Sequence, residues 1–233
     1  MTRPLILDPE TVPVVPAPPL GPALAPARLD PDSLRERLRQ KRMPRTLRPG
    51  DGLLGPTGVW TPAAVLVPLV PRPDGLQVLL TRRAAHLAKH PGQIAFPGGR
   101  SDPGDADAVA TALREAQEEI GLAPASVEVL GSLPAYHTVT GYAVTPVVGL
   151  VSDPKLVLHA GEVDEAFEVP LAFLMDPANH RRHLWTQGGV TRDYHSMPWT
   201  PPAGAADKGP EAYFIWGATA AMLRNLYLVL QDQ

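Results

Sequence analysis

The chain has 233 residues, 44% of them hydrophobic, and a formal net charge of −3 at pH 7. This length predicts one domain with added segments, and the charge gives no overall reason to expect nucleic-acid or membrane binding. The absence of cysteine excludes disulfides and thiol catalysis. Without a membrane-length apolar run or a secretory signal, a cytoplasmic protein is expected.

Residues 1–31 contain nine prolines. Proline disfavours helix interiors and central strands, so this segment is predicted to be an extended or disordered arm, most commonly a loose tail. Residues 32–233 are predicted to form a single domain with an N-terminal basic helix and a C-terminal helix. Ser33 and Glu36 have the spacing of a capping box, which predicts the first helix over residues 33–43.

The stretch from residue 35 to residue 48 is strongly basic, with Glu36 as its single acid. Its cations are Arg35, Arg37, Arg39, Lys41, Arg42, Arg45 and Arg48. One interpretation is a patch for polyanions such as RNA or a substrate phosphate. The alternative, a solvated basic face, is favoured because no aromatic residues are interleaved for base stacking.

Residues 63–70 and 76–81 are predicted strands joined by a turn over 71–75. They lead into a Pro-Gly-Gly turn at residues 97–99, an acidic loop and a predicted helix that ends at Gly121. At about 100° per residue, the apolar residues of this helix fall on one arc and its carboxylates on another, roughly 140° round. The apolar arc consists of Val109, Leu113, Ala116 and Ile120, and the acidic arc of Glu115, Glu118 and Glu119.

Three carboxylates at this spacing repel one another, and such pairs destabilise a helix unless a cation is bound. A solvated helix face is the ordinary interpretation of such a cluster. The preceding Gly98 and Gly99, however, allow a close backbone approach that a surface helix does not need. The combination favours a site for Mg²⁺ or Mn²⁺, since hard ions take carboxylate oxygens.

Residues 99–122 resemble the Nudix box, a glycine followed at fixed spacing by R-E-x-x-E-E-x-G. The chain supplies the second part unbroken at residues 114–121, but it has Ala106, with Asp105 beside it, where the pattern has a glutamate. Residues 96–105, FPGGRSDPGD, resemble the coenzyme A pyrophosphatase branch of that family. A motif of the same branch is matched upstream at Leu79, Leu80, Thr81, Arg83 and Gly92, whereas Ala84 and Ala88 replace its serine and second arginine.

After the box, residues 126–133 and 143–151 are predicted strands, and Pro146 suggests an edge or a bulge. Residues 162–171 again resemble the family. Residues 171–176 are predicted as a short helix, 181–197 as a hairpin, 201–210 as a loop and 213–230 as the final helix.

The resemblance implies an α+β fold, an α/β/α sandwich with a mixed β-sheet flanked by helices and extra segments at both termini. It also implies metal-dependent hydrolysis of coenzyme A to adenosine 3′,5′-bisphosphate and phosphopantetheine. The implied metal ligands are Glu115, Glu119 and Glu118. Glu118, Arg114, Glu162 and Glu165 are the implied catalytic residues, and Arg83, Lys89, Gly98, Gly99 and Arg100 the implied substrate-binding residues.

Two alternatives stay open. One is a Nudix hydrolase of another substrate, such as ADP-ribose or a dinucleoside polyphosphate, for which the replacements at Ala84 and Ala88 leave room. The other is a non-catalytic binding module that contacts a nucleotide or RNA, against which the intact glutamate set argues. The oligomeric state is not predicted.

Overall fold

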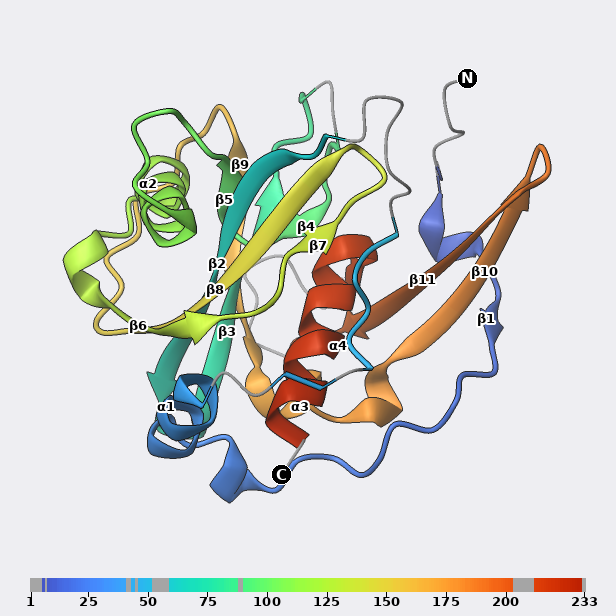
Figure 1. The fold of residues 1–233 in the computed structure, drawn as a ribbon, viewed down its shortest axis with the longest axis horizontal. Helices are drawn as coiled ribbons and strands as arrows, with labels where there is room; N and C mark the ends of the chain where they lie inside the picture. The colour runs from blue at the N-terminus through green and yellow to red at the C-terminus, as the bar shows by residue number, and fades with distance from the viewer. Residues whose placement is uncertain are drawn as a thin grey trace.

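The computed structural model describes residues 6, 8–40, 43–44, 46–51, 59–87, 90–202 and 212–231. These residues form an eight-stranded sheet and a four-stranded sheet, with helices packed against them (Figure 1). The helices are α1 (Pro31–Arg39), α2 (Ala108–Ile120), α3 (Leu171–Leu174) and α4 (Gly217–Gln231). Among the described residues, no helix combines the length and the apolar character needed to cross a membrane.

The larger sheet has the order β4-β3-β2-β8-β6, with β5 paired to β2, β7 to β8 and β9 to β3. Its strands are β2 (Thr61–Arg72), β3 (Gly75–Arg83), β4 (Ile94–Ala95), β5 (Gly98–Arg100), β6 (Val127–Ser132), β7 (Tyr136–His137), β8 (Tyr142–Val151) and β9 (Val163–Pro170). Strands β2 and β8 are parallel, whereas the other described pairs in this sheet are antiparallel. The sheet is therefore mixed.

Successive residues of β2 are buried on opposite faces of this sheet, as the two-residue period of a strand requires. Leu66 packs in the cluster beneath α2, and Val67 packs in the larger cluster with α1, α3 and α4. Figure 1 shows α2 on one side of the sheet and α4 on the other. This arrangement confirms the predicted fold class.

Pro146 does not mark an edge, because β8 is paired on both sides. It lies opposite the gap between β6 and β7. The last residue of β6 pairs with Val147, and the first residue of β7 pairs with Val144. Its carbonyl accepts a hydrogen bond from Leu133 N–H at 2.9 Å. A residue without an N–H fits here because neither β6 nor β7 pairs with it.

The smaller sheet has the order β1-β10-β11-β12. Its strands are β1 (Val14–Val15), β10 (Arg181–Gln187), β11 (Val190–Trp199) and β12 (Tyr213–Trp216). The predicted hairpin is present, and Gly188 and Gly189 at its turn have φ of 57° and 76°. The prediction that the last helix begins at residue 213 is wrong. Residues 213–216 pair with β11, which suits their aromatic and β-branched side chains, and α4 starts at Gly217.

The N-terminal arm is extended, but the expectation of a loose tail is wrong for its described residues. Its proline-rich backbone has few N–H donors and is held through its carbonyls. Tyr194 Oη donates to the Pro9 carbonyl at 2.6 Å, and Tyr227 Oη to the Pro22 carbonyl at 2.8 Å. Strand β1 also pairs with β10. The arm therefore fastens onto the smaller sheet and α4.

The first helix begins two residues earlier than predicted, at Pro31, and ends at Arg39. Asp30 caps it, because its carboxylate accepts from the N–H groups of Asp32 and Ser33, each at 3.0 Å. The predicted capping by Ser33 is therefore wrong. A proline in the first helical position leaves no donor unpaired, which favours this start.

Three described arginines of the basic stretch are tied to the rest of the domain, whereas Arg39 is exposed and lies 3.9 Å from Glu36 of its own helix. Arg35 Nε donates to Glu128 at 2.8 Å, Arg37 Nε donates to the Val229 carbonyl at 2.6 Å, and Arg48 lies 3.7 Å from Asp193. Arg35, Arg37 and Arg48 therefore serve contacts within the domain, which neither the polyanion patch nor the solvated basic face had predicted. Lys41, Arg42 and Arg45 lie outside the described residues.

Candidate active site

Helix α2 carries the predicted acidic arc, and its two ends are fixed by local contacts. The Asp107 carboxylate caps the start by accepting from Ala110 N–H at 2.9 Å. Gly121 ends the helix in the left-handed conformation, with φ of 70°, as predicted. Ala116 and Ile120 are fully buried as predicted, and Ala112 joins them. On another face, Glu115 and Glu119 lie against β5, whereas the Glu118 side chain is largely exposed.

Gly98 brings the backbone of β5 against the buried end of α2. Its N–H donates to Glu119 Oε2 at 3.0 Å. Its φ is 153°, and a Cβ there would lie 2.4 Å from the Ala64 carbonyl oxygen. A side chain at residue 98 would thus be excluded by the β2 backbone. The contact explains why Glu119 is only 4% exposed although the helix wheel alone places it among polar neighbours.

Gly99 packs in the same way against Glu115, which precedes Glu119 on the helix. A Cβ at Gly99 would lie 2.6 Å from Cδ and Oε2 of Glu115, closer than atoms of this kind approach one another. The Pro-Gly-Gly turn is therefore required for the packing of both carboxylates. The two glycines thus lie against Glu119 and Glu115.

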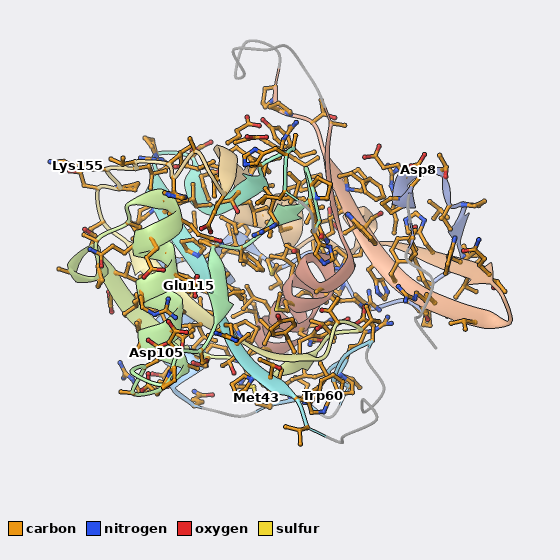
Figure 2. The ribbon with its side chains drawn as sticks, turned by 90° about the horizontal axis from the view of Figure 1, so that it is seen from above. Asp8, Met43, Trp60, Asp105, Glu115 and Lys155 are labelled. Atoms are coloured by element: carbon orange, nitrogen blue, oxygen red, sulfur yellow. The ribbon has the colours of Figure 1, made fainter. Side chains whose placement is uncertain are left out.

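Arg114 connects the helix to the preceding loop. Its Nε and Nη2 donate to the two oxygens of Asp105, each at 2.9 Å, and its Nη1 donates to Glu115 at 2.9 Å and to Glu118 at 3.2 Å. Its Nη2 also donates to the Arg100 carbonyl at 3.1 Å. Figure 2 shows Asp105 and Glu115 together beside α2, far from Asp8 of the N-terminal arm. Arg114 thus holds Glu115 and Glu118 in place.

The sequence reasoning missed the role of Asp105. This carboxylate binds Arg114 through both oxygens and also accepts from Thr111 Oγ1 at 2.9 Å and from Asp102 N–H at 2.9 Å. Arg114 holds the pKa of Asp105 well below its usual range. The available signal was its position beside Ala106, where the family pattern has a glutamate.

Burial and mutual repulsion perturb the two inner carboxylates. Burial raises the pKa of Glu119 to about 7, and the charges of Glu115 and Glu162 add to the rise, although Gly98 N–H and Arg83 oppose it. Burial also raises the pKa of Glu115 against the opposing effect of Arg114. A nearby cation would relieve both the desolvation and the repulsion.

Glu162 and Arg83 act on these carboxylates through their charges. Glu162 precedes β9, and its charge reaches both Glu115 and Glu119. Arg83, at the end of β3, places Nη1 3.8 Å from Glu119 Oε1. Arg100 contributes its carbonyl to Arg114, and its exposed guanidinium lies 3.9 Å from Asp102. Lys89 lies outside the described residues.

The structure does not bring Glu165 to this cluster. Its carboxylate accepts from Tyr213 Oη at 2.6 Å and lies 3.2 Å from Arg82 Nε. It shares a strand face with Phe167, which packs in the larger cluster, opposite the α2 face. Arg82 pairs with Glu165 and Arg83 with Val163, with a register shift between the two pairs. The predicted catalytic role of Glu165 has no support in this geometry.

The residues fit a hard divalent cation by donor type. Glu115, Glu118 and Glu119 offer carboxylate oxygens, and burial, which raises the pKa of Glu119, leaves the charge of this carboxylate with little solvation. Within the described chain, no three histidine, cysteine, aspartate or glutamate side chains already converge as a metal-binding group. Arg114 and Gly98 N–H hold the carboxylates individually instead.

Comparisons with known proteins agree with the sequence motif. The NUDIX domain family model matches residues 60–182. The uncharacterized Nudix hydrolase NudL of Escherichia fergusonii is 46% identical over 170 residues, which cover 71% of this chain and 81% of that protein. NudL of Escherichia coli K12 matches to the same extent.

Solved structures show weaker similarity. A crystal structure of a C. elegans Ap4A hydrolase binary complex is 21% identical, with a TM-score of 0.40 over 48% of this chain and 80% of that chain. A MutT/nudix family protein from Enterococcus faecalis is 16% identical, with a TM-score of 0.42 over 84% of this chain and 67% of that chain. The assignment thus rests on the family model and the NudL sequences, and by these the chain belongs to the Nudix hydrolase family.

Proposed function

We propose that this protein hydrolyses the diphosphate bond of coenzyme A or its derivatives, in the presence of Mg²⁺ or Mn²⁺, to adenosine 3′,5′-bisphosphate and phosphopantetheine. The observation that supports this proposal most is the packing of Gly98 and Gly99 against two carboxylates of α2, those of Glu119 and Glu115. The FPGG segment that makes this turn is also the segment that resembles the coenzyme A branch.

In this proposal the carboxylates of Glu115, Glu118 and Glu119 hold the cation. When bound, a divalent cation lowers the pKa of a water molecule and neutralises diphosphate oxygens. Arg114 keeps two of these carboxylates in place through its bonds to Glu115 and Glu118, and Asp105 anchors Arg114 in turn. Hydrogen bonds of this kind, made to the ligands of a metal ion, fix the orientation of those ligands and increase the affinity for the metal.

Glu162 is the proposed proton acceptor. As the water oxygen attacks phosphorus and the bridging P–O bond breaks, a carboxylate oxygen of Glu162 takes the proton of the water. This side chain is about half exposed, with 48% of its side-chain surface accessible, so it can reach a solvent molecule. It also lies close enough to Glu115 and Glu119 to influence their ionisation.

Arg83, Arg100 and Lys89 are the proposed contacts of the substrate phosphates, including the 3′-phosphate that distinguishes coenzyme A from most dinucleotides. The Arg83 side chain is 30% exposed beside Glu119, and that of Arg100 is 67% exposed at the end of β5. Arg83 could therefore serve both the carboxylate and a bound anion, whereas Arg100 is open to solvent.

A Nudix hydrolase of ADP-ribose or of a dinucleoside polyphosphate is the main alternative. The replacement of serine by Ala84 was one reason to keep it. Ala84 is fully buried, however, and offers no exposed surface to a substrate, whereas Ala88 lies outside the described residues. The replacement is thus poor ground for a change of substrate.

The test is product analysis after incubation of the purified protein with coenzyme A, ADP-ribose or a dinucleoside polyphosphate, with and without Mg²⁺ or Mn²⁺. Metal-dependent release of adenosine 3′,5′-bisphosphate and phosphopantetheine is expected, and Glu119→Gln should abolish it. Glu168→Gln is the matched control, because Glu168 binds Arg72 away from α2. Cleavage of ADP-ribose alone would overturn the substrate, and no turnover of any diphosphate would favour a binding module.

A further inference from the structure

Residues 157–162 lie between β8 and β9 in the chain and pack against the carboxyl end of α2. Val157 N–H donates to the Ile120 carbonyl and His159 N–H donates to the Glu119 carbonyl, each at 2.9 Å. The last carbonyls of a helix have no partner within the helix itself, so these bonds satisfy them. The segment is therefore fastened to the turn of α2 that carries Glu119.

The backbone of Glu162 is held on both sides. Its N–H donates to the His159 carbonyl at 2.9 Å, and its carbonyl accepts from Ala84 N–H at 2.9 Å. Glu162 is thereby linked to the end of α2 through His159. It is linked to the end of β3 through Ala84, which follows Arg83. The backbone position is thus fixed, whereas the half-exposed side chain still has rotational freedom.

The imidazole of His159 lies beside that side chain. Its Nδ1 is 3.8 Å from Glu162 Oε1. The ring rests over Gly161, where a Cβ would lie 3.0 Å from His159 Cε1 and 3.4 Å from Nδ1. Glycine at residue 161 therefore leaves room for the ring close to the carboxylate.

We propose that His159 is a positioning residue for Glu162, whose side chain it restricts to conformations that turn the carboxylate toward Glu115 and Glu119. The inference rests on the proposed function, in which Glu162 accepts the proton of the attacking water. His159 itself touches no reacting atom. Its contribution is to reduce the number of unproductive conformations before the reaction.

His159→Ala tests this role and keeps the backbone bonds intact. We expect kcat to fall on the order of tenfold, with KM nearly unchanged, because outer contacts of catalytic groups have effects of this size. His159→Asn should retain part of the rate, since its side-chain amide occupies a position close to Nδ1. Leu158→Ala is the control on the same segment and should leave kcat and KM at the wild-type values.

The decisive measurement repeats His159→Ala in a Glu162→Gln background. If His159 acts through Glu162, its removal should cost nothing further there. An equal loss in both backgrounds, or a change confined to KM, would overturn the inference. A wild-type rate in His159→Ala would overturn it while leaving the proposed function intact, whereas a wild-type protein that cleaves no diphosphate would refute the function itself.

Discussion

Replacing Gly99 with alanine adds one methyl group directly against the Glu115 carboxylate. The new Cβ would lie 2.6 Å from Glu115 Cδ, and ordinary contact begins at 3.4 Å, so the carboxylate must move by about 0.8 Å or more. The backbone at Gly99 does not have positive φ, which means that alanine introduces no backbone strain. The displaced atoms are the end of a flexible side chain, so the protein should still fold.

A displacement of this size at a catalytic ligand is expected to lower kcat/KM on the order of 100-fold. This loss corresponds to about 2.7 kcal/mol of transition-state stabilisation. The assay is the rate of product release from coenzyme A at saturating Mg²⁺, accompanied by thermal unfolding to confirm that the variant is folded. The effect should appear mainly in kcat if Glu115 acts in the transition state.

Gly104→Ala is the matched control, because a Cβ there meets nothing within 4 Å and the residue lies in the loop that joins β5 to α2. Its activity should equal that of the wild type. If Gly99→Ala retained kcat/KM within about threefold of the wild type, the assignment of Glu115 to the site would be refuted. A loss in Gly104→Ala of similar size would instead attribute the effect to the loop as a whole.

Three further predictions concern residues outside this contact. Glu165→Gln should leave kcat unchanged but lower the free energy of unfolding by about 1 kcal/mol, because Tyr213 Oη loses a charged acceptor. Asp105→Asn should lower kcat on the order of tenfold, because Arg114 loses its bidentate anchor. Burial lowers the pKa of His195 from 6.5 to about 3, so the unfolded chain binds more protons between these values. Stability should therefore fall as the pH drops below 6.5, by about 2 kcal/mol at pH 5 from His195 alone.

Each of these has a direct measurement. Steady-state kinetics together with urea unfolding check Glu165→Gln, and a large kcat loss would restore Glu165 as a catalytic residue. Steady-state kinetics check Asp105→Asn, and a wild-type kcat would show that Arg114 does not depend on its bonds to Asp105. Unfolding free energy against pH should be less steep for His195→Gln than for the wild type, and identical slopes would contradict the burial argument.

Local patterns were sufficient for the elements that depend on neighbouring residues. The extent of α2 follows from its apolar period and from Gly121, which adopts the left-handed conformation expected of a helix stop. The Gly188-Gly189 turn, likewise, predicts the hairpin because both residues take positive φ. Residues 213–216 could not be assigned in this way. They become a strand because β11 offers them a partner, and without that partner their pattern runs on into the helix that follows.

The same division applies to the site. The sequence alone determined which residues could bind a cation, since the carboxylates of α2 and the two glycines are recognisable by type and spacing. Only the tertiary structure decided how they are used. It buries Glu119 against Gly98, joins Asp105 to Arg114 and turns Glu165 toward Tyr213 on the opposite face of the sheet. The reason is physical, because spacing along one chain sets the direction of a side chain, whereas its partner depends on which other strand or loop packs against it.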